Sequence, residues 1–206
     1  LSILEVSHRH KDFVAVMEEA TDLVKKALNV PNGYSVIFLQ GGASLGFAIS
    51  ALNTRRDPIR ATYINKGTWA KKAMTEAKKA GYVVLEAASS ADTNFNYIPK
   101  NVVTESNSDY LHFTSNNTIF GTQFKEIPQS PLPLVCDMSS DIFAREINVA
   151  DFDLIYAGAQ KNMGPAGTTL YIFKKEILGK SSVPIPTMLD LKTHADKDSM
   201  FNTPPV

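Results

Sequence analysis

The chain has 206 residues, 44% of them hydrophobic, and its 21 basic and 21 acidic side chains leave no net charge. A chain of this length can bury a substantial core, so we expect a single domain. The balanced charge argues against nucleic acid or an anionic membrane as a partner, because the protein has no net field to attract either.

The lone cysteine, Cys136, lies in an apolar run and is expected to be a buried small residue. A single cysteine excludes a disulfide framework or a cysteine-rich metal site within one chain, and we expect no metal. No apolar stretch is long enough to span a membrane, and the first residues lack the pattern of a secretion signal. These features predict a cytoplasmic protein.

Apolar residues recur at helical spacing from Asp12 to Leu28, and Pro31-Asn32-Gly33 ends this predicted helix. A strand is expected over Tyr34 to Leu39, followed by a glycine turn at Gln40 to Gly46 and a second helix that extends to about Asn53. A strand, a glycine turn and a helix in this order place free backbone N–H groups at one point, which is typical of an anion site. The alternative is an ordinary tight turn.

Strands and helices then alternate. A helix is expected from Thr68 to Ala80, with Thr68 as a candidate cap and Gly81 as its stop, and a polar loop from Ser89 to Asn101. The predicted strands cover 61–64, 82–87, 109–114 with strand character up to Ile119, 132–136, and the apolar run after Asp153. This alternation indicates an α/β fold with three layers, α/β/α, in which a mostly parallel sheet binds ligands at the carboxyl ends of its strands.

Two charged residues follow neighbouring predicted strands. Lys161 comes directly after a strand that ends in small residues, and Asp137 follows the strand 132–136. This pair meets two needs of pyridoxal 5′-phosphate: the lysine forms an imine with its aldehyde, and the carboxylate keeps its ring nitrogen protonated. Taken singly, Lys161 is more typical of a solvated loop and Asp137 of a helix cap.

The segment 157–167, Ala-Gly-Ala-Gln-Lys-Asn-Met-Gly-Pro-Ala-Gly, closely resembles the cofactor-lysine segment of the phosphoserine aminotransferase family, class-V enzymes of pyridoxal-phosphate fold type I. Four other segments resemble the same family in the same order, namely 5–10, 40–44, 137–142 and 199–205. The resemblance implies that 1–206 is the cofactor-binding large domain. It also implies that this domain is incomplete at both ends, because the family carries a further amino-terminal segment and a carboxyl-terminal small domain.

The resemblance assigns roles around the cofactor. Lys161 would hold the aldehyde and move the proton, and Asp137 would pair with the ring nitrogen. Trp69 would stack on the ring, although plain core packing is the simpler interpretation of a lone tryptophan. The remaining implied cofactor contacts are Thr118 beside the phenolic oxygen and Ala43, Ser44 and Gln160 at the phosphate.

Further implied roles concern a second subunit and the substrate. Asn202 and Thr203 match residues that reach the phosphate in the neighbouring subunit, which implies a homodimer. His8 and Arg9 match a pair that binds substrate anions, although an isolated His-Arg is often a solvated surface pair. The chain departs from some members of the family at Ala43-Ser44-Leu45, where those members place an arginine that also contacts substrate.

The implied reaction exchanges amino and keto groups between L-glutamate and 3-phosphohydroxypyruvate, giving O-phospho-L-serine and 2-oxoglutarate for serine and, in bacteria, pyridoxine biosynthesis. One alternative is another fold-type I enzyme, such as an alanine:glyoxylate aminotransferase. A second is a catalytically silent cofactor-binding fragment. A nucleotide-binding domain has only the glycine turn in its favour, because Gly41-Gly42-Ala43-Ser44-Leu45-Gly46 lacks the dinucleotide and P-loop spacings.

Overall fold

The computed structural model describes residues 2–205. Its helices are α1 (Lys11–Ala27), α2 (Gly42–Thr54), α3 (Thr68–Lys79) and α4 (Leu191–Ala195). Its strands are β1 (Tyr34–Leu39), β2 (Arg60–Asn65), β3 (Val83–Ser89), β4 (Leu111–Thr114), β5 (Asn116–Asn117), β6 (Thr122–Gln123), β7 (Leu134–Asp137), β8 (Leu154–Gly158) and β9 (Thr169–Lys174). Within these residues, no helix is both long and apolar enough to cross a membrane.

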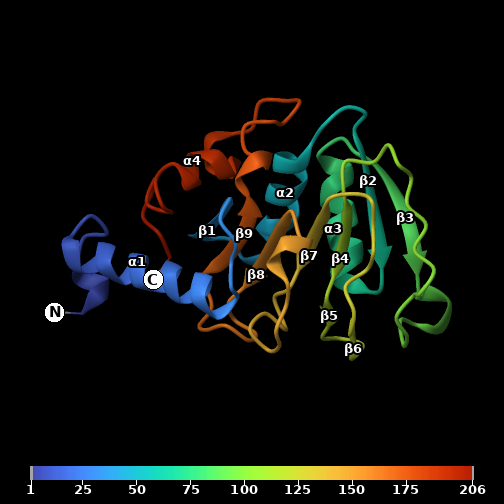
Figure 1. The fold of residues 1–206 in the computed structure, drawn as a ribbon, viewed down its shortest axis with the longest axis horizontal. Coiled ribbons are helices and arrows are strands. Elements are labelled where there is room, and N and C mark those ends of the chain that lie inside the picture. The colour runs from blue at the N-terminus through green and yellow to red at the C-terminus, as the bar shows by residue number, and fades with distance from the viewer. Residues whose placement is uncertain (1, 206) are drawn as a thin grey trace.

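Seven of the described strands form one sheet in the order β1-β9-β8-β7-β4-β2-β3 (Figure 1). β9 pairs antiparallel with both β1 and β8, while the pairs β8–β7, β7–β4, β4–β2 and β2–β3 are parallel. β1 therefore runs in the same direction as β7 and β8, and the carboxyl ends of all three lie along one edge of the sheet. The sequence analysis did not predict β9.

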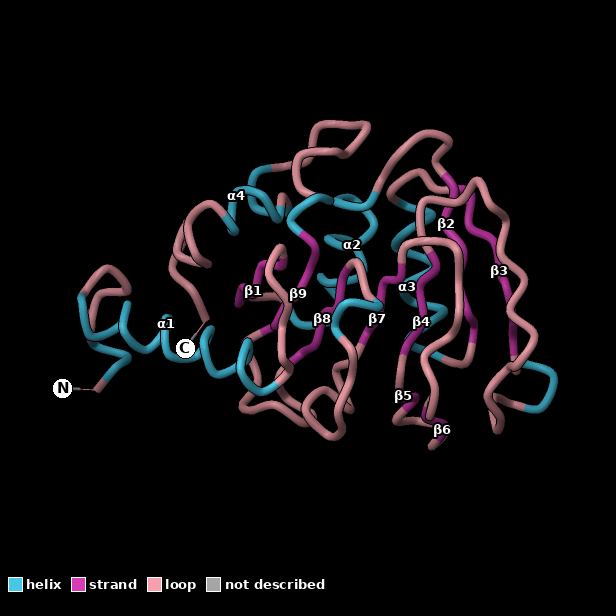
Figure 2. Tube along the Cα trace, in the orientation of Figure 1, coloured by secondary structure: helices cyan, strands magenta, loops and turns pink. Residues whose placement is uncertain are grey.

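Helices and loops cover the two faces of the sheet differently. Phe47 of α2 and Ala73 of α3 pack with Tyr63 and Tyr156 on one face. On the other face, α1 contributes Phe13, and irregular segments between β6 and β8 supply most of the remaining cover. Figure 2 shows these long loops beside the helices. The predicted three-layer α/β/α fold is confirmed, with one outer layer made of α1 and irregular chain.

Two details of the predicted elements were wrong. Thr68 is not the cap of α3: the cap is Gly67, whose φ of 135° is a conformation that side chains rarely adopt. An added Cβ at Gly67 would overlap the Asn117 side chain, so the close approach of the hairpin requires glycine. The strand character expected up to Ile119 also breaks at Ser115, where the chain leaves the sheet and forms the separate hairpin β5–β6.

A buried imidazole makes the free energy of unfolding depend on pH. His112 of β4 is fully buried, with Nε2 2.7 Å from the Tyr156 hydroxyl, and burial lowers its pKa from 6.5 to about 3. Below pH 6.5 His112 binds a proton in the unfolded chain but stays neutral in the folded chain. Stability therefore falls as the pH falls. We expect this group to cost about 3 kcal/mol between pH 6.5 and 4.

Urea unfolding at pH 7 and pH 4 tests this prediction against His112→Gln, which retains a polar partner for Tyr156 but does not titrate. The parent should lose clearly more stability than the variant on acidification. Equal losses in the two proteins would show that His112 does not carry the effect.

Candidate active site

The ends of β1, β7 and β8 surround a small cavity of about 100 Å³. Its walls come from the start of α2, the start of α3 and the segments that follow β7 and β8. The lining residues are Gly42, Ala43, Ser44, Trp69, Asp137, Ser139, Gln160 and Lys161. Six of the predicted site residues are among them, and they converge from four separate stretches of sequence.

Asp137 is the last residue of β7 and is only 4% exposed. Its Oδ1 accepts hydrogen bonds from the backbone N–H of Ser139 at 3.0 Å and from the Ser139 hydroxyl at 2.6 Å. Oδ2 accepts none from the described residues, although Asp137 lines the cavity. Burial raises the pKa of this carboxyl, and the nearby positive charge of Lys161 acts in the opposite direction. The result is a buried carboxylate that has one oxygen free for a protonated partner.

Ser139 is a site residue that the sequence analysis missed. Its hydroxyl donates to Asp137 and accepts from the backbone N–H of Gly158 at 3.0 Å, so it ties the segment after β7 to the end of β8. Asp137 and Ser139 have the two-residue spacing at which an aspartate accepts from the backbone ahead of it. That spacing was the available signal.

Lys161 lies three residues beyond β8 and is exposed. Its Nζ donates to Oγ1 of Thr118 at 2.9 Å and lies 5.0 Å from the centroid of the Trp69 ring. Thr118 is not in the cavity wall but lies in the β5–β6 hairpin, which projects beyond the end of β4 (Figure 2). The structure therefore brings three predicted residues together around one amine. Trp69 also packs against the core, as the simpler interpretation expects, and its stacking on a cofactor ring stays a prediction.

The start of α2 forms the opposite wall. Gly41, with φ 98°, is the cap residue, and no side chain caps the first turn. The first N–H groups of α2 are therefore available to an anion. Gly158 allows this close approach, because a Cβ there would lie 2.8 Å from Oε1 of Gln160 and 3.4 Å from the backbone nitrogen of Ala43. The geometry expected of an anion site is present.

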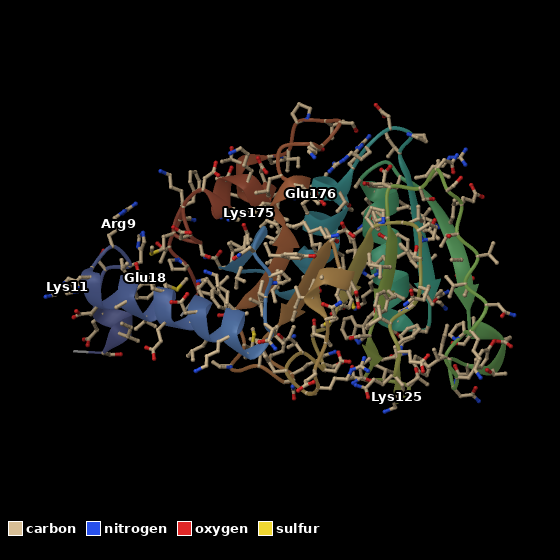
Figure 3. The ribbon with its side chains drawn as sticks, viewed as in Figure 1. Arg9, Lys11, Glu18, Lys125, Lys175 and Glu176 are labelled. Atoms are coloured by element: carbon tan, nitrogen blue, oxygen red, sulfur yellow. The ribbon has the colours of Figure 1, made fainter. Side chains whose placement is uncertain are left out.

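Besides Thr118, four predicted residues do not line the cavity. Arg9 is exposed at the protruding amino-terminal end of α1, away from the sheet (Figure 3), and the neighbouring His8 is half-buried. Asn202 and Thr203 are exposed, and the Thr203 carbonyl accepts from the side chain of Gln40, which precedes the glycine turn. The segment 202–203 thus lies beside the β1–α2 turn of its own chain. The roles of these four residues stay predictions.

This arrangement combines four chemical functions within one cavity. It offers an amine that can attack an aldehyde, a buried carboxylate for a protonated nitrogen, an aromatic face and a group of backbone donors for an anion. Lys161 is the one cation among the described residues that line it. A ligand that uses all four functions must itself carry an aldehyde, a basic ring nitrogen and an anionic group.

Comparisons with known proteins identify the family of this chain. The sequence matches the aminotransferase class-V family over residues 2–206. It is 56% identical to the phosphoserine aminotransferase of Flavobacterium psychrophilum, over all of this chain and 58% of that protein. The phosphoserine aminotransferase structure from Bacillus circulans subsp. alkalophilus superimposes with a TM-score of 0.94 at 43% identity, and a pyridoxal-phosphate-bound one from Trichomonas vaginalis with 0.93 at 33%.

Each of these two structures is matched over all of this chain and 57% or 58% of its own length. The chain thus spans a little over half the length of the relatives it matches. The family match covers nearly every residue, and the superposition extends over the whole chain. The chain therefore belongs to the class-V aminotransferase family.

Proposed function

We propose that this chain is the cofactor-binding large domain of a pyridoxal-phosphate-dependent phosphoserine aminotransferase. The reaction exchanges amino and keto groups between L-glutamate and 3-phosphohydroxypyruvate and yields O-phospho-L-serine and 2-oxoglutarate. The observation that carries the proposal is that Asp137 and Lys161 line one cavity together with the start of α2. The names of the most similar relatives support this substrate class over that of an alanine:glyoxylate aminotransferase.

The residues of the cavity fit the cofactor. The free Oδ2 of Asp137 suits a protonated ring nitrogen, which would stabilise this buried carboxylate, whose pKa is raised by burial. Trp69 offers a ring face, and Thr118 offers a hydroxyl for the phenolic oxygen. The N–H groups of Ala43 and Ser44, with the Gln160 side chain, would bind the phosphate.

When bound, the cofactor supplies an aldehyde and a protonated ring that withdraws electrons from the substrate's Cα. Lys161 would hold the aldehyde through its amine. Its Nζ would also be the group that moves the proton at the substrate's Cα, as general base and as general acid. The hydroxyl of Thr118 holds this amine in place through its 2.9 Å hydrogen bond.

The substrate and partner contacts form the outer part of the proposal. Arg9 and His8 would bind substrate anions, and Asn202 with Thr203 would reach the phosphate site of a second subunit in a homodimer. The exposure of Arg9, Asn202 and Thr203 leaves them available for such contacts. A reducing cytoplasm is the proposed compartment, in keeping with a buried free thiol at Cys136.

A silent cofactor-binding fragment remains the second candidate for the chain taken alone. One observation favours it. Lys161 is the single cation among the described residues of the cavity, and its amine would be needed to hold the cofactor. A doubly anionic substrate would then lack a cation to bind it in the cavity of this chain.

Trapping with borohydride tests the proposal and separates the candidates. After incubation with pyridoxal phosphate and reduction, we expect a pyridoxyl mass on the peptide that contains Lys161, because only an imine is fixed by this treatment. The complete protein should then transaminate phosphoserine but not alanine, whereas the isolated 206-residue chain should bind cofactor with little turnover.

Label at another lysine, or none, would remove the basis of the proposal. Turnover of alanine in place of phosphoserine would favour the glyoxylate enzyme.

A further inference from the structure

Lys66, at the carboxyl end of β2, is a lysine buried without a carboxylate partner. It is 1% exposed and forms no ion pair with any described residue. Its Nζ donates to the carbonyl oxygens of Thr122 at 2.8 Å and Ser115 at 3.3 Å, and lies 4.5 Å from the centroid of the Phe124 ring. Burial lowers its pKa to about 8, so the amine keeps its proton and its three donors at pH 7.

The two carbonyl groups stand on opposite sides of a hairpin base. Ser115 precedes β5 and Thr122 begins β6, so the single ammonium of Lys66 joins the two arms of the hairpin that carries Thr118 at its tip. Desolvating a lysine is costly, and a lysine buried without an acid needs compensation from well-placed acceptors. These bonds therefore fix the arms of the hairpin relative to each other.

A buried carboxylate, that of Asp141, also binds the base of this hairpin. Asp141 is 6% exposed and accepts from the Ser115 hydroxyl through one oxygen and from Nε2 of Gln123, at 3.1 Å, through the other. It belongs to the segment that begins with Asp137. The hairpin base thus contacts both a cation from the β2–α3 turn and an anion from the segment after β7.

The backbone of Lys66 is bound to the same hairpin. The Asn117 side chain donates to the Lys66 carbonyl, and Lys66 stands three residues before Trp69. The Lys161 amine has two close partners in the described structure, the Thr118 hydroxyl and the Trp69 ring. These partners come from the two elements that Lys66 holds together.

We propose that Lys66 is a positioning residue, which clamps the hairpin base together with Asp141 and so holds Thr118 and Trp69 at the Lys161 amine. Only the expected effect of Lys66 on turnover rests on the proposed function. The placement of the hairpin against the turn is a property of the cofactor-free protein and is measured without turnover.

The test replaces Lys66 with methionine in the complete protein, which keeps the side-chain length and removes the donors. We expect kcat to fall about 10- to 100-fold, because a small displacement of a reacting group is costly, with little change in KM. In the cofactor-free protein, amide exchange across 115–124 should rise, and the fluorescence of Trp69, the one tryptophan among these 206 residues, should shift. Lys78→Met, an exposed lysine of α3, is the matched control and should change none of these quantities.

A double-mutant cycle with Thr118→Val decides whether Lys66 acts through the hairpin. If it does, the loss in kcat for the double variant is clearly smaller than the product of the two single losses. Asp141→Asn weakens the same clamp and should show the same pattern to a lesser degree, and it decides the matter if Lys66→Met does not fold. Independent losses, or unchanged exchange across 115–124, would overturn the proposal.

These outcomes separate the two proposals. Absence of phosphoserine turnover in the parent protein would refute the proposed function. The exchange and fluorescence measurements on Lys66→Met would still decide whether Lys66 holds the hairpin and the turn together.

Discussion

Replacing Lys161 with alanine is expected to lower kcat for phosphoserine by about 10⁴-fold or more, because the change removes both the nucleophilic amine and the group that moves the proton. The structure gives no substitute for it, since Lys161 is the one cation among the described residues of the cavity. Steady-state turnover of the complete protein, with no added amine, measures the loss. The pyridoxyl mass fixed by borohydride should also disappear from the peptide that contains position 161.

Lys175→Ala is the matched control. Lys175 is an exposed lysine that follows β9, on the side of the molecule away from the β5–β6 hairpin (Figure 3), and its loss should leave kcat unchanged. Thr118→Val should give an intermediate result, because the amine remains and only its 2.9 Å hydrogen bond is lost. Turnover by Lys161→Ala at the rate of the parent would place the reactive amine elsewhere.

The parts of the site that the sequence predicted are those fixed by local chemistry. Asp137 ends one apolar strand, Lys161 follows another, and the glycine turn at 41–42 leads into a helix, so neighbouring residues determine where each group emerges. A parallel arrangement then places their carboxyl ends on one edge. The convergence of these groups at one cavity confirms that reasoning.

The parts that the sequence did not predict depend on distant partners. The sequence of β9 is an ordinary apolar run. Its antiparallel position between β1 and β8 is determined by the packing of the whole sheet. Lys66 is a similar case: its acceptors lie 49 and 56 residues along the chain. A lysine next to a strand normally indicates a solvated end, so no local pattern revealed a buried clamp.

A third group of residues came from the resemblance alone. His8 and Arg9 carry no pattern beyond their charge, and Asn202 with Thr203 reads as a polar turn before two prolines. Arg9 does not line the cavity of its own chain and lies at the protruding end of α1 (Figure 3), so its proposed role requires parts that a single chain of 206 residues does not bring together. Physical reasoning from this sequence reaches the candidate cofactor cavity and stops short of the proposed substrate residues.

Asp137→Asn is expected to separate activity from stability. The asparagine can still accept the two bonds from Ser139, so the local geometry is retained. It carries no negative charge, and a buried charge aimed at the reacting group contributes about 10²- to 10³-fold to rate, so kcat/KM should fall by that factor. Ser139→Ala, which keeps the carboxylate and one of its two hydrogen bonds, should lose less.

The same substitution should stabilise the cofactor-free protein at neutral pH. Burial raises the pKa of Asp137 above its ordinary value of 3.8, so the folded state holds this proton up to a higher pH than the unfolded state. Stability therefore falls as the pH rises through the folded pKa, and the ionised carboxylate destabilises the fold above it. The advantage of Asp137→Asn should be present at pH 7 and vanish below about pH 4, the range in which the unfolded carboxyl is protonated.

Urea unfolding of the cofactor-free parent and variant at pH 7 and pH 3.5 measures the first effect, and turnover of the complete protein measures the second. A variant that is more stable and nearly inactive would mean that the buried charge is retained for the cofactor at the expense of the fold. A variant less stable than the parent at pH 7 would show that the cavity already compensates this carboxylate. In that case its free oxygen would no longer argue for a protonated ring nitrogen beside it.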